Sequence, residues 1–233
     1  MSRKNAFARL TYALQRSMST GSAEGQEVGI DNSATLWASN PRNIRGDMAS
    51  VVPRQQIRGF FNYPLPRFSH NTLMKHTLGG WELSGNFTWH DGDRLNVTVG
   101  SDWNFDGFGG DRPNQVSPIH YLRQKQGNLL VQWMDKSAFA NPPAPSADNP
   151  YPFGTLPRMA VRGPNQFFAG SALMKNFHWK ERLRFQLRTD ISNFFNHPNW
   201  SNPNVNLSSS VFGMIQTKSG GGRVVQLQAK LIF

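Results

Sequence analysis

Strict alternation of apolar and polar residues is the feature that most constrains the fold of this chain. From Arg182 to Ser192 the odd positions hold Leu, Phe, Leu, Thr and Ile, and the even positions hold Arg, Arg, Gln, Arg, Asp and Ser. Successive side chains of a β-strand point to opposite faces, whereas a helix would not separate every odd residue from every even one. The pattern therefore predicts strands with one apolar and one polar face. It recurs in five further segments, the fourth of which is weaker because Lys175 falls on its apolar side: residues 8–15, 56–65, 81–89, 169–178 and 223–233.

The lengths of these segments and of the gaps between them favour a membrane β-barrel. The segments run for roughly ten residues, whereas strands of globular proteins average about five or six and strands that cross a bilayer obliquely need about nine to eleven. The gaps alternate between long and short, as do the extracellular loops and periplasmic turns of outer-membrane barrels. We therefore expect an all-β fold of about six antiparallel up-and-down strands from a transmembrane β-barrel, which would form an open curved sheet when isolated. The expected extracellular loops are residues 18–53, 91–168 and 196–222, and the expected periplasmic turns are residues 66–79 and 179–181.

Composition and charge exclude several classes of protein and argue against others. The chain has no cysteine, which excludes a disulfide-stapled module and a cysteine-ligated zinc site. No apolar run of signal-peptide length occurs in the first twenty residues, and no window approaches a transmembrane helix. The formal net charge of +11 invites a nucleic-acid interface. The basic residues, however, fall on the polar side of the alternating segments, which in a barrel faces the water-filled lumen, so we expect no nucleic-acid partner. These basic residues are Arg9, Arg58, Arg182, Arg184 and Arg188.

Several short motifs resemble, in the same order along the chain, those of one protein family. Residues 78–88 read LGGWELSGNFT, and residues 102–107 read DWNFDG ahead of DRPN at 111–114. Further along, the runs are VRGP at 161–164, KNF at 175–177, RLRFQLR at 182–188 and NFFNHPN at 193–199. They resemble elements of the Oar-like TonB-dependent receptors, outer-membrane proteins that often contain a carboxypeptidase-regulatory-like domain. The family's LRGPG element has a second glycine where this chain has Asn165.

This resemblance implies a function in transport. Complete transporters of this kind have about 22 strands around a plug, so residues 1–233 would form the C-terminal part of such a barrel. The expected partners are the rest of the barrel, the plug, outer-membrane lipid and the TonB system, and the expected location is the outer membrane of a Gram-negative bacterium. The intact protein would take up a large or scarce solute. The alternative is a cell-surface or adhesive β-protein without a transport role.

The C-terminal residues carry a second expectation of the same kind. The chain ends in Leu231-Ile232-Phe233, which is similar to the terminal-aromatic strand by which the barrel-assembly machinery recognises its clients. Leu231 and Phe233 are therefore the residues that we predict to act as a barrel-assembly signal.

One loop has the spacing of a calcium site. Asp102, Asn104 and Asp106 occupy positions 1, 3 and 5, with a glycine at position 6, as in a calcium-binding loop. Position 12, where an EF-hand needs a bidentate glutamate, is Pro113, so Asp111 at position 10 would have to contribute in a different geometry. Two interpretations stay open: a Ca²⁺ ion bound by these four residues, or an extracellular loop rich in Asx turns.

Catalytic motifs are absent from the sequence. The six histidines lack paired-ligand spacing, and the chain has no nucleophile elbow and no phosphate-binding glycine loop that precedes a helix. We therefore expect no enzyme and no catalytic residues, and the sequence identifies no substrate-binding residues.

Overall fold

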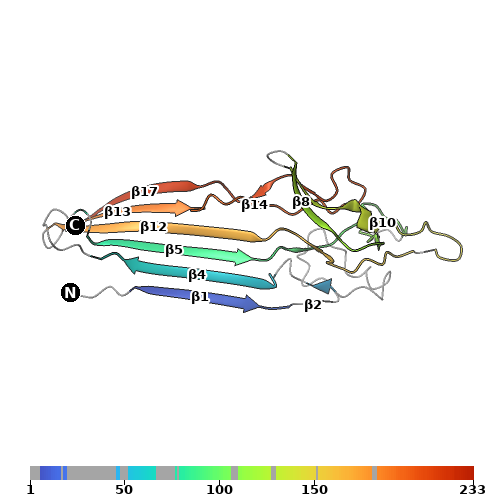
Figure 1. Cartoon of the computed structure of the whole chain (residues 1–233), viewed down its shortest axis with the longest axis horizontal. Coiled ribbons are helices and arrows are strands. Elements are labelled where there is room, and N and C mark those ends of the chain that lie inside the picture. Colours follow the sequence, from blue (N-terminus) through green and yellow to red (C-terminus); the bar gives the residue numbers. More distant parts are fainter. Residues whose placement is uncertain are drawn as a thin grey trace.

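Six long strands form one antiparallel sheet in the computed structural model of this chain (Figure 1). The structure describes residues 6–16, 18–19, 46–47, 52–66, 77, 79–105, 110–126, 130–150, 152–179 and 183–233. The strands lie side by side in chain order, which confirms the predicted all-β, up-and-down fold. They are β1 (Phe7–Leu14), β4 (Gln55–Pro64), β5 (Trp81–His90), β12 (Gln166–Trp179), β13 (Leu183–Ser192) and β17 (Val224–Ile232).

The register of the sheet places the apolar positions of the alternating segments on one face, and leaves a few apolar residues, such as Phe60 and Met174, on the other. Residues directly opposite each other in an antiparallel pair lie on the same face. One row across five strands reads Leu227, Thr189, Leu173, Leu83 and Tyr63. The face opposite to it carries the basic residues Arg9, Arg58, Arg184 and Arg188. The predicted separation into an apolar and a polar face is therefore confirmed, except for Arg182, which lies outside the described residues.

Glycines on the apolar face are covered by aromatic rings from the neighbouring strand. Gly59 of β4 lies opposite Phe87 of β5, and Gly85 of β5 lies opposite Phe61 of β4. A Cβ atom at Gly59 would lie 2.3 Å from Phe87 Cε1, and one at Gly85 would lie 2.6 Å from Phe61 Cε1. Each phenylalanine thus fills the space that its glycine partner leaves, which keeps the apolar surface continuous.

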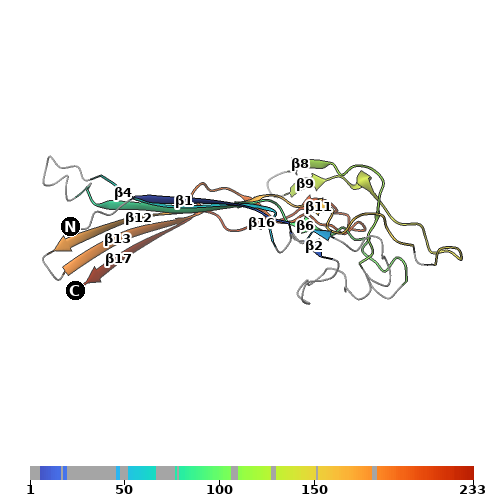
Figure 2. The same cartoon turned by 90° about the horizontal axis from the view of Figure 1, so that it is seen from below.

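The sheet is open, as predicted for these strands in isolation. β1 and β17 form its two edges, and no pairing joins them among the described residues. Seen from below, the sheet is twisted, with β12, β13 and β17 fanning away from β1 and β4 at the end where β17 terminates (Figure 2). An open edge exposes a row of backbone N–H and C=O groups that hydrocarbon cannot satisfy.

The long connections fold into one body at one end of the sheet (Figures 1 and 2). We call this body the loop head: residues 91–105, 110–126, 130–150, 152–165 and 193–222. β12 begins at Gln166, so the loop predicted to end at residue 168 ends at residue 165. The loop head contains the elements β6 (Arg94–Leu95), β7 (Asn114–Gln115), β8 (Tyr121–Gln126), β9 (Leu130–Met134), η1 (Lys136–Ala138), β10 (Phe139–Ala140), β11 (Val161–Arg162), β14 (Asn199–Trp200), β15 (Met214–Ile215) and β16 (Lys218–Ser219).

A separate hydrophobic core explains why the loop head is ordered. Its buried members come from residues far apart in the sequence: Val97, Met134, Ala138, Phe139, Leu156, Val161, Leu207 and Phe212. Phe139 and Phe212 pack edge to face with ring centroids 5.5 Å apart. These apolar residues come from several short segments that are far apart in the chain, so no continuous run with a period of 2 or 3.6 could reveal them.

A two-stranded pair, β2 (Met18–Ser19) with β3 (Gly46–Asp47), lies within the predicted loop 18–53, most of which lies outside the described residues. The predicted turn 66–79 is described only at residues 66, 77 and 79, and the turn 179–181 only at residue 179. In the described part of the chain, no helix has the length and apolar character needed to span a membrane.

Candidate functional site

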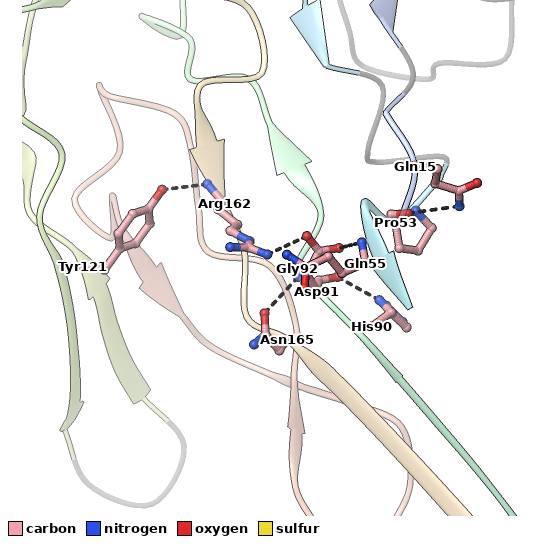
Figure 3. Close-up of polar contacts among 9 residues, drawn as sticks. All are labelled: Gln15, Pro53, Gln55, His90, Asp91, Gly92, Tyr121, Arg162 and Asn165. Atoms are coloured by element: carbon pink, nitrogen blue, oxygen red, sulfur yellow. Dashed lines mark hydrogen bonds and ion pairs between the residues drawn. The ribbon is translucent and has the colours of Figure 1, made fainter. Parts of the chain in front are cut away.

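The loop head is joined to the sheet through a buried carboxylate. Asp91 directly follows β5 and is 1% exposed. Its Oδ1 accepts a hydrogen bond from the backbone N–H of Gln55 in β4 at 3.2 Å, and its Oδ2 accepts from Arg162 Nη2 at 2.5 Å (Figure 3). Arg162 belongs to β11, the short strand that precedes β12. One carboxylate therefore connects two strand ends of the sheet to the far end of the 91–165 connection.

Aromatic side chains of the loop head hold the backbone of Arg162. Tyr121 Oη accepts a hydrogen bond from the Arg162 N–H at 2.9 Å (Figure 3), and Trp133 Nε1 donates to the Arg162 carbonyl at 2.7 Å. The two rings pack edge to face with centroids 6.0 Å apart. Because both backbone groups of Arg162 are bonded, the guanidinium is presented to Asp91 from a fixed position.

Two glycines let the chain segments on either side of this ion pair approach closely. Gly163 N–H donates to the Asp93 carbonyl at 2.9 Å, and Gly92 N–H donates to Asn165 Oδ1 at 3.1 Å (Figure 3). A Cβ atom at Gly92 would lie 1.9 Å from the Gly163 carbonyl oxygen, so only glycine fits there. We call the set Asp91, Gly92, Arg162, Gly163 and Asn165 the junction.

The junction explains one of the motifs that the sequence displays. The run VRGP at 161–164 supplies the arginine and the glycine, and the run HDGDR at 90–94 supplies their partners. In the sequence the first run stands out only by resemblance, and Asp91, Gly92 and Tyr121 were not among the predicted site residues. The signal that could have identified Asp91 is an aspartate–glycine pair directly after an alternating segment, where a chain leaving a strand needs a turn and a capped backbone.

The structure brings two of the four predicted calcium ligands, Asn104 and Asp111, together through a hydrogen bond of the loop itself. Asp111 Oδ2 accepts from the backbone N–H groups of Trp103 at 2.6 Å and Asn104 at 3.1 Å. Asn104 is fully buried, Asp102 is partly exposed, and Asp106 lies outside the described residues. Within the described ranges, no three side chains of the types His, Cys, Asp and Glu form a group that could hold a metal ion. Ca²⁺ binding by this loop stays a prediction.

A 3₁₀ turn in the loop head is capped by an acidic side chain. Asp135 accepts hydrogen bonds from Ser137 Oγ at 2.6 Å and from Ser137 N–H at 3.0 Å. These bonds favour the carboxylate, so they lower the pKa of Asp135 below its usual value. The charged cap holds η1 next to Phe139, a member of the core of the loop head.

Lys175 explains the weak alternation of its segment. It is the one charged residue on the apolar face of the described strands, yet it is only 2% exposed. Its ammonium group donates to the Thr77 carbonyl and lies 5.2 Å from the ring centre of Trp81 and 4.8 Å from that of Phe177. The charge is therefore satisfied inside the protein by a carbonyl and two rings, and does not face hydrocarbon alone.

The predicted assembly residues lie at an edge of the sheet. Leu231 is on the apolar face of β17 opposite Phe185, and Phe233 follows the strand with 94% of its surface exposed. Among the residues that the structure describes, β17 pairs only with β13, so its other side is available for pairing. The predicted role of Leu231 and Phe233 in assembly is compatible with this position and stays a prediction.

A twisted antiparallel sheet of long strands, apolar on one face and polar on the other, with a folded head at one end, defines a membrane β-barrel protein. Residues 2–226 match the family model described as outer membrane beta barrel domain, so the chain belongs to that family and the protein lies in the outer membrane of a Gram-negative bacterium. No curated protein and no solved structure matches the chain.

The ion pair of the junction is expected to contribute measurably to stability. In the protein as the cell makes it, purified in detergent, Asp91→Asn and Arg162→Gln should each lower the free energy of unfolding. A double-mutant cycle should give a coupling of about 1–3 kcal/mol, because a nearly buried carboxylate loses a charged partner. Urea unfolding measures both quantities. The matched control is the more exposed pair Arg188–Asp190 in β13, for which the coupling should be about 0–1 kcal/mol. Equal coupling in the two pairs would contradict a special role for Asp91.

Proposed function

We propose that this outer-membrane chain is the C-terminal part of an Oar-like TonB-dependent receptor barrel, which takes up a large or scarce solute. The observation that carries the proposal is the polar face of the sheet. Arg9, Arg58, Arg184 and Arg188 lie on this face in three different strands, so it is suited to face a wide, water-filled lumen. The ordered series of family-like motifs from residue 78 to residue 199 supports the same conclusion.

In this proposal the two ends of the sheet have different tasks. The loop head lies at the outer end, where it would meet the solute first, and the junction keeps it fixed on the strands. The short turns lie at the periplasmic end, where the plug and the TonB system would act. The rest of the barrel would pair with the free edges of β1 and β17, and outer-membrane lipid would cover the apolar face. No catalytic step is involved.

The experiment that tests the proposal separates transport from adhesion. The reading frame upstream of Met1 should encode a plug and a TonB box, and the protein isolated from cells should bind the periplasmic domain of TonB. Binding that is abolished by deleting the TonB box would support transport. A protein that has neither element and does not bind TonB would be assigned to the alternative, a surface or adhesive β-protein.

Cysteine labelling tests the orientation of the sheet. A single cysteine at Asn204, in the loop head, should react with a membrane-impermeant maleimide on intact cells, because the last strand of such barrels ends in the periplasm. A single cysteine at Thr77, at the other end of the sheet, should react only after the outer membrane is opened. Labelling of the Thr77 variant and protection of the Asn204 variant on intact cells would invert the topology.

Deletion of Phe233 tests the assembly signal. Removing this residue should lower the amount of protein in the outer membrane and leave aggregated or degraded protein in the periplasm, because the exposed terminal ring is the expected recognition point. Fractionation and immunoblotting measure the distribution. The control is Val224→Ala, at the opposite end of the same strand and 59% exposed. Equal insertion of the Phe233 deletion, the control and the unmodified protein would remove the predicted role.

A further inference from the structure

The strand β8 (Tyr121–Gln126) forms a free sheet edge in the loop head. It belongs to a three-stranded sheet of order β15–β9–β8, and among the described residues it pairs only with β9. Figure 2 shows β8 at the outer margin of the loop head. Every residue from Leu122 to Gln126 is exposed. The main-chain N–H and C=O groups on the outer side of β8 are therefore open to a further strand.

The backbone of β8 contains a bulge close to its first residue. The register with β9 shifts between Tyr121 and Gln124, and Arg123, inside this bulge, has a φ of 54°. Bulges and non-glycine residues in the left-handed region are concentrated next to functional sites, where they re-aim a side chain. The guanidinium of Arg123 lies 5.3 Å from the ring centre of Trp133. The bulge and the ring together hold one cation in a defined position at the edge.

The charge of this edge is positive and has no counter-charge in its own hairpin. The segment from Tyr121 to Met134 contains two cations, Arg123 and Lys125, and no carboxylate. Lys125 makes no hydrogen bond or ion pair with any described residue, and Arg123 contacts a neutral ring. Opposite charges on paired strands stabilise the pairing. A strand with carboxylates on alternate residues, about 7 Å apart, would match two cations that are two positions apart.

The same two cations argue against a second copy of this chain as the partner of β8. A two-fold axis at Gln124 would set Arg123 opposite Lys125 of the other copy, and an axis at either cation would set that residue opposite itself. Like charges directly opposite each other destabilise a strand pair. Lysine on an edge strand is a common protection against self-pairing. This protection does not act against an acidic strand, which the charges attract.

We propose that the edge of β8 binds an extended acidic segment of a polypeptide outside the cell, which adds a fourth strand to the sheet β15–β9–β8. Main-chain hydrogen bonds would provide affinity, and carboxylates near Arg123 and Lys125 would provide selectivity. The inference goes beyond the proposed transport function, because it concerns a partner held on the loop head. It needs neither the lumen nor TonB.

Isothermal titration of the detergent-purified protein, as the cell makes it, tests the proposal with two hexapeptides. The probes are Glu-Val-Glu-Val-Glu-Val and its basic counterpart Lys-Val-Lys-Val-Lys-Val. The acidic peptide should bind at least about tenfold more tightly, because only its charges complement the edge. Two further forms of the acidic peptide are N-methylated on alternate residues, one form for each of the two frames. Since a strand pairs through alternate N–H groups, one of these forms should lose binding.

Two substitutions in β8 and a matched control locate the binding site. Lys125→Glu should weaken binding of the acidic peptide by about tenfold, since attraction is replaced by repulsion. Arg123→Gly keeps the positive φ without strain and removes the charge, which should weaken binding by about fivefold. The control Lys218→Glu makes the same charge change at an exposed lysine of β16, which pairs with β14. It should leave the affinity unchanged.

The remaining outcomes each contradict one proposal. Absence of binding by the acidic peptide, equal binding of the basic peptide, or equal affinity of the Lys125 and Lys218 variants would overturn the inference. Full binding of both N-methylated forms would also overturn it, because the contact would then involve charge without strand pairing. Dimerisation of the unmodified protein that the acidic peptide reverses would assign the edge to a second copy. A protein that binds the acidic peptide but not TonB would refute the transport proposal alone.

Discussion

Replacing Gly92 with alanine is expected to separate the loop head from the sheet. The added Cβ would lie 1.9 Å from the Gly163 carbonyl oxygen, 2.4 Å from its carbonyl carbon and 2.9 Å from the Pro164 carbonyl oxygen. All three atoms belong to the backbone, so no side-chain rotation can relieve the overlap. The strands must move apart, and the hydrogen bond between Gly92 and Asn165 is lost with them. We expect a loss of about 3 kcal/mol in the free energy of unfolding.

The measurement combines urea unfolding with limited trypsin digestion of intact cells. A loop head released from the junction should be cut faster, while the strands stay protected in the membrane. The matched control is Gly221→Ala, because a Cβ atom at that position meets no atom within 4 Å. This variant should have the stability of the unmodified protein. If the two alanine variants unfold alike, close packing at Gly92 is not what holds the head in place.

The contrast between the sheet and the junction shows what sequence patterns can reveal. Residues Leu183 to Ser192 could be assigned to one strand because apolar and polar residues alternate along this segment. This period of two follows from strand geometry alone. Even the exception at Lys175 had a physical cause, since its ammonium group is enclosed by the Thr77 carbonyl and two aromatic rings. Local periodicity was sufficient for these strands because every strand obeys the same rule.

The loop head follows no such rule. Val97 and Leu207 belong to one core although 110 positions separate them in the chain, and only tertiary packing brings them together. Likewise Asp91 and Arg162 are 71 positions apart, and neither residue is unusual in its own segment. For the predicted calcium ligands the difficulty is different: the sequence pattern is present, but it has two explanations. Their spacing fits an ion, yet Asp111 Oδ2 bonds the backbone of Trp103 and Asn104, a use of a carboxylate that spacing alone cannot distinguish from metal binding.

Two substitutions at adjacent residues of β13, Leu187→Arg and Arg188→Leu, are expected to lower the free energy of unfolding by very different amounts. Leu187 lies on the apolar face, opposite Ala229 and Lys175, and Arg188 lies on the polar face, opposite Gln228 and Met174. Leu187→Arg places a charge toward lipid near the middle of the strand and should cost about 2–4 kcal/mol. Arg188→Leu removes the bonds to Asp190 on a face that contacts water, which should cost only about 1 kcal/mol or less.

Because the two variants alter neighbouring residues of one strand, the difference between them reports which face of the sheet contacts lipid. A general effect on the stability of the strand would be similar in both. Unfolding of the protein from lipid vesicles in urea gives both costs under one condition. A larger cost for Arg188→Leu would mean that the register is shifted by one residue, since a one-residue slip moves every side chain to the other face. Such a slip would also turn Arg9, Arg58 and Arg184 toward lipid, because the same pairing links all six strands. The measured order of the two costs therefore decides which face of the entire sheet meets the membrane and which face meets water.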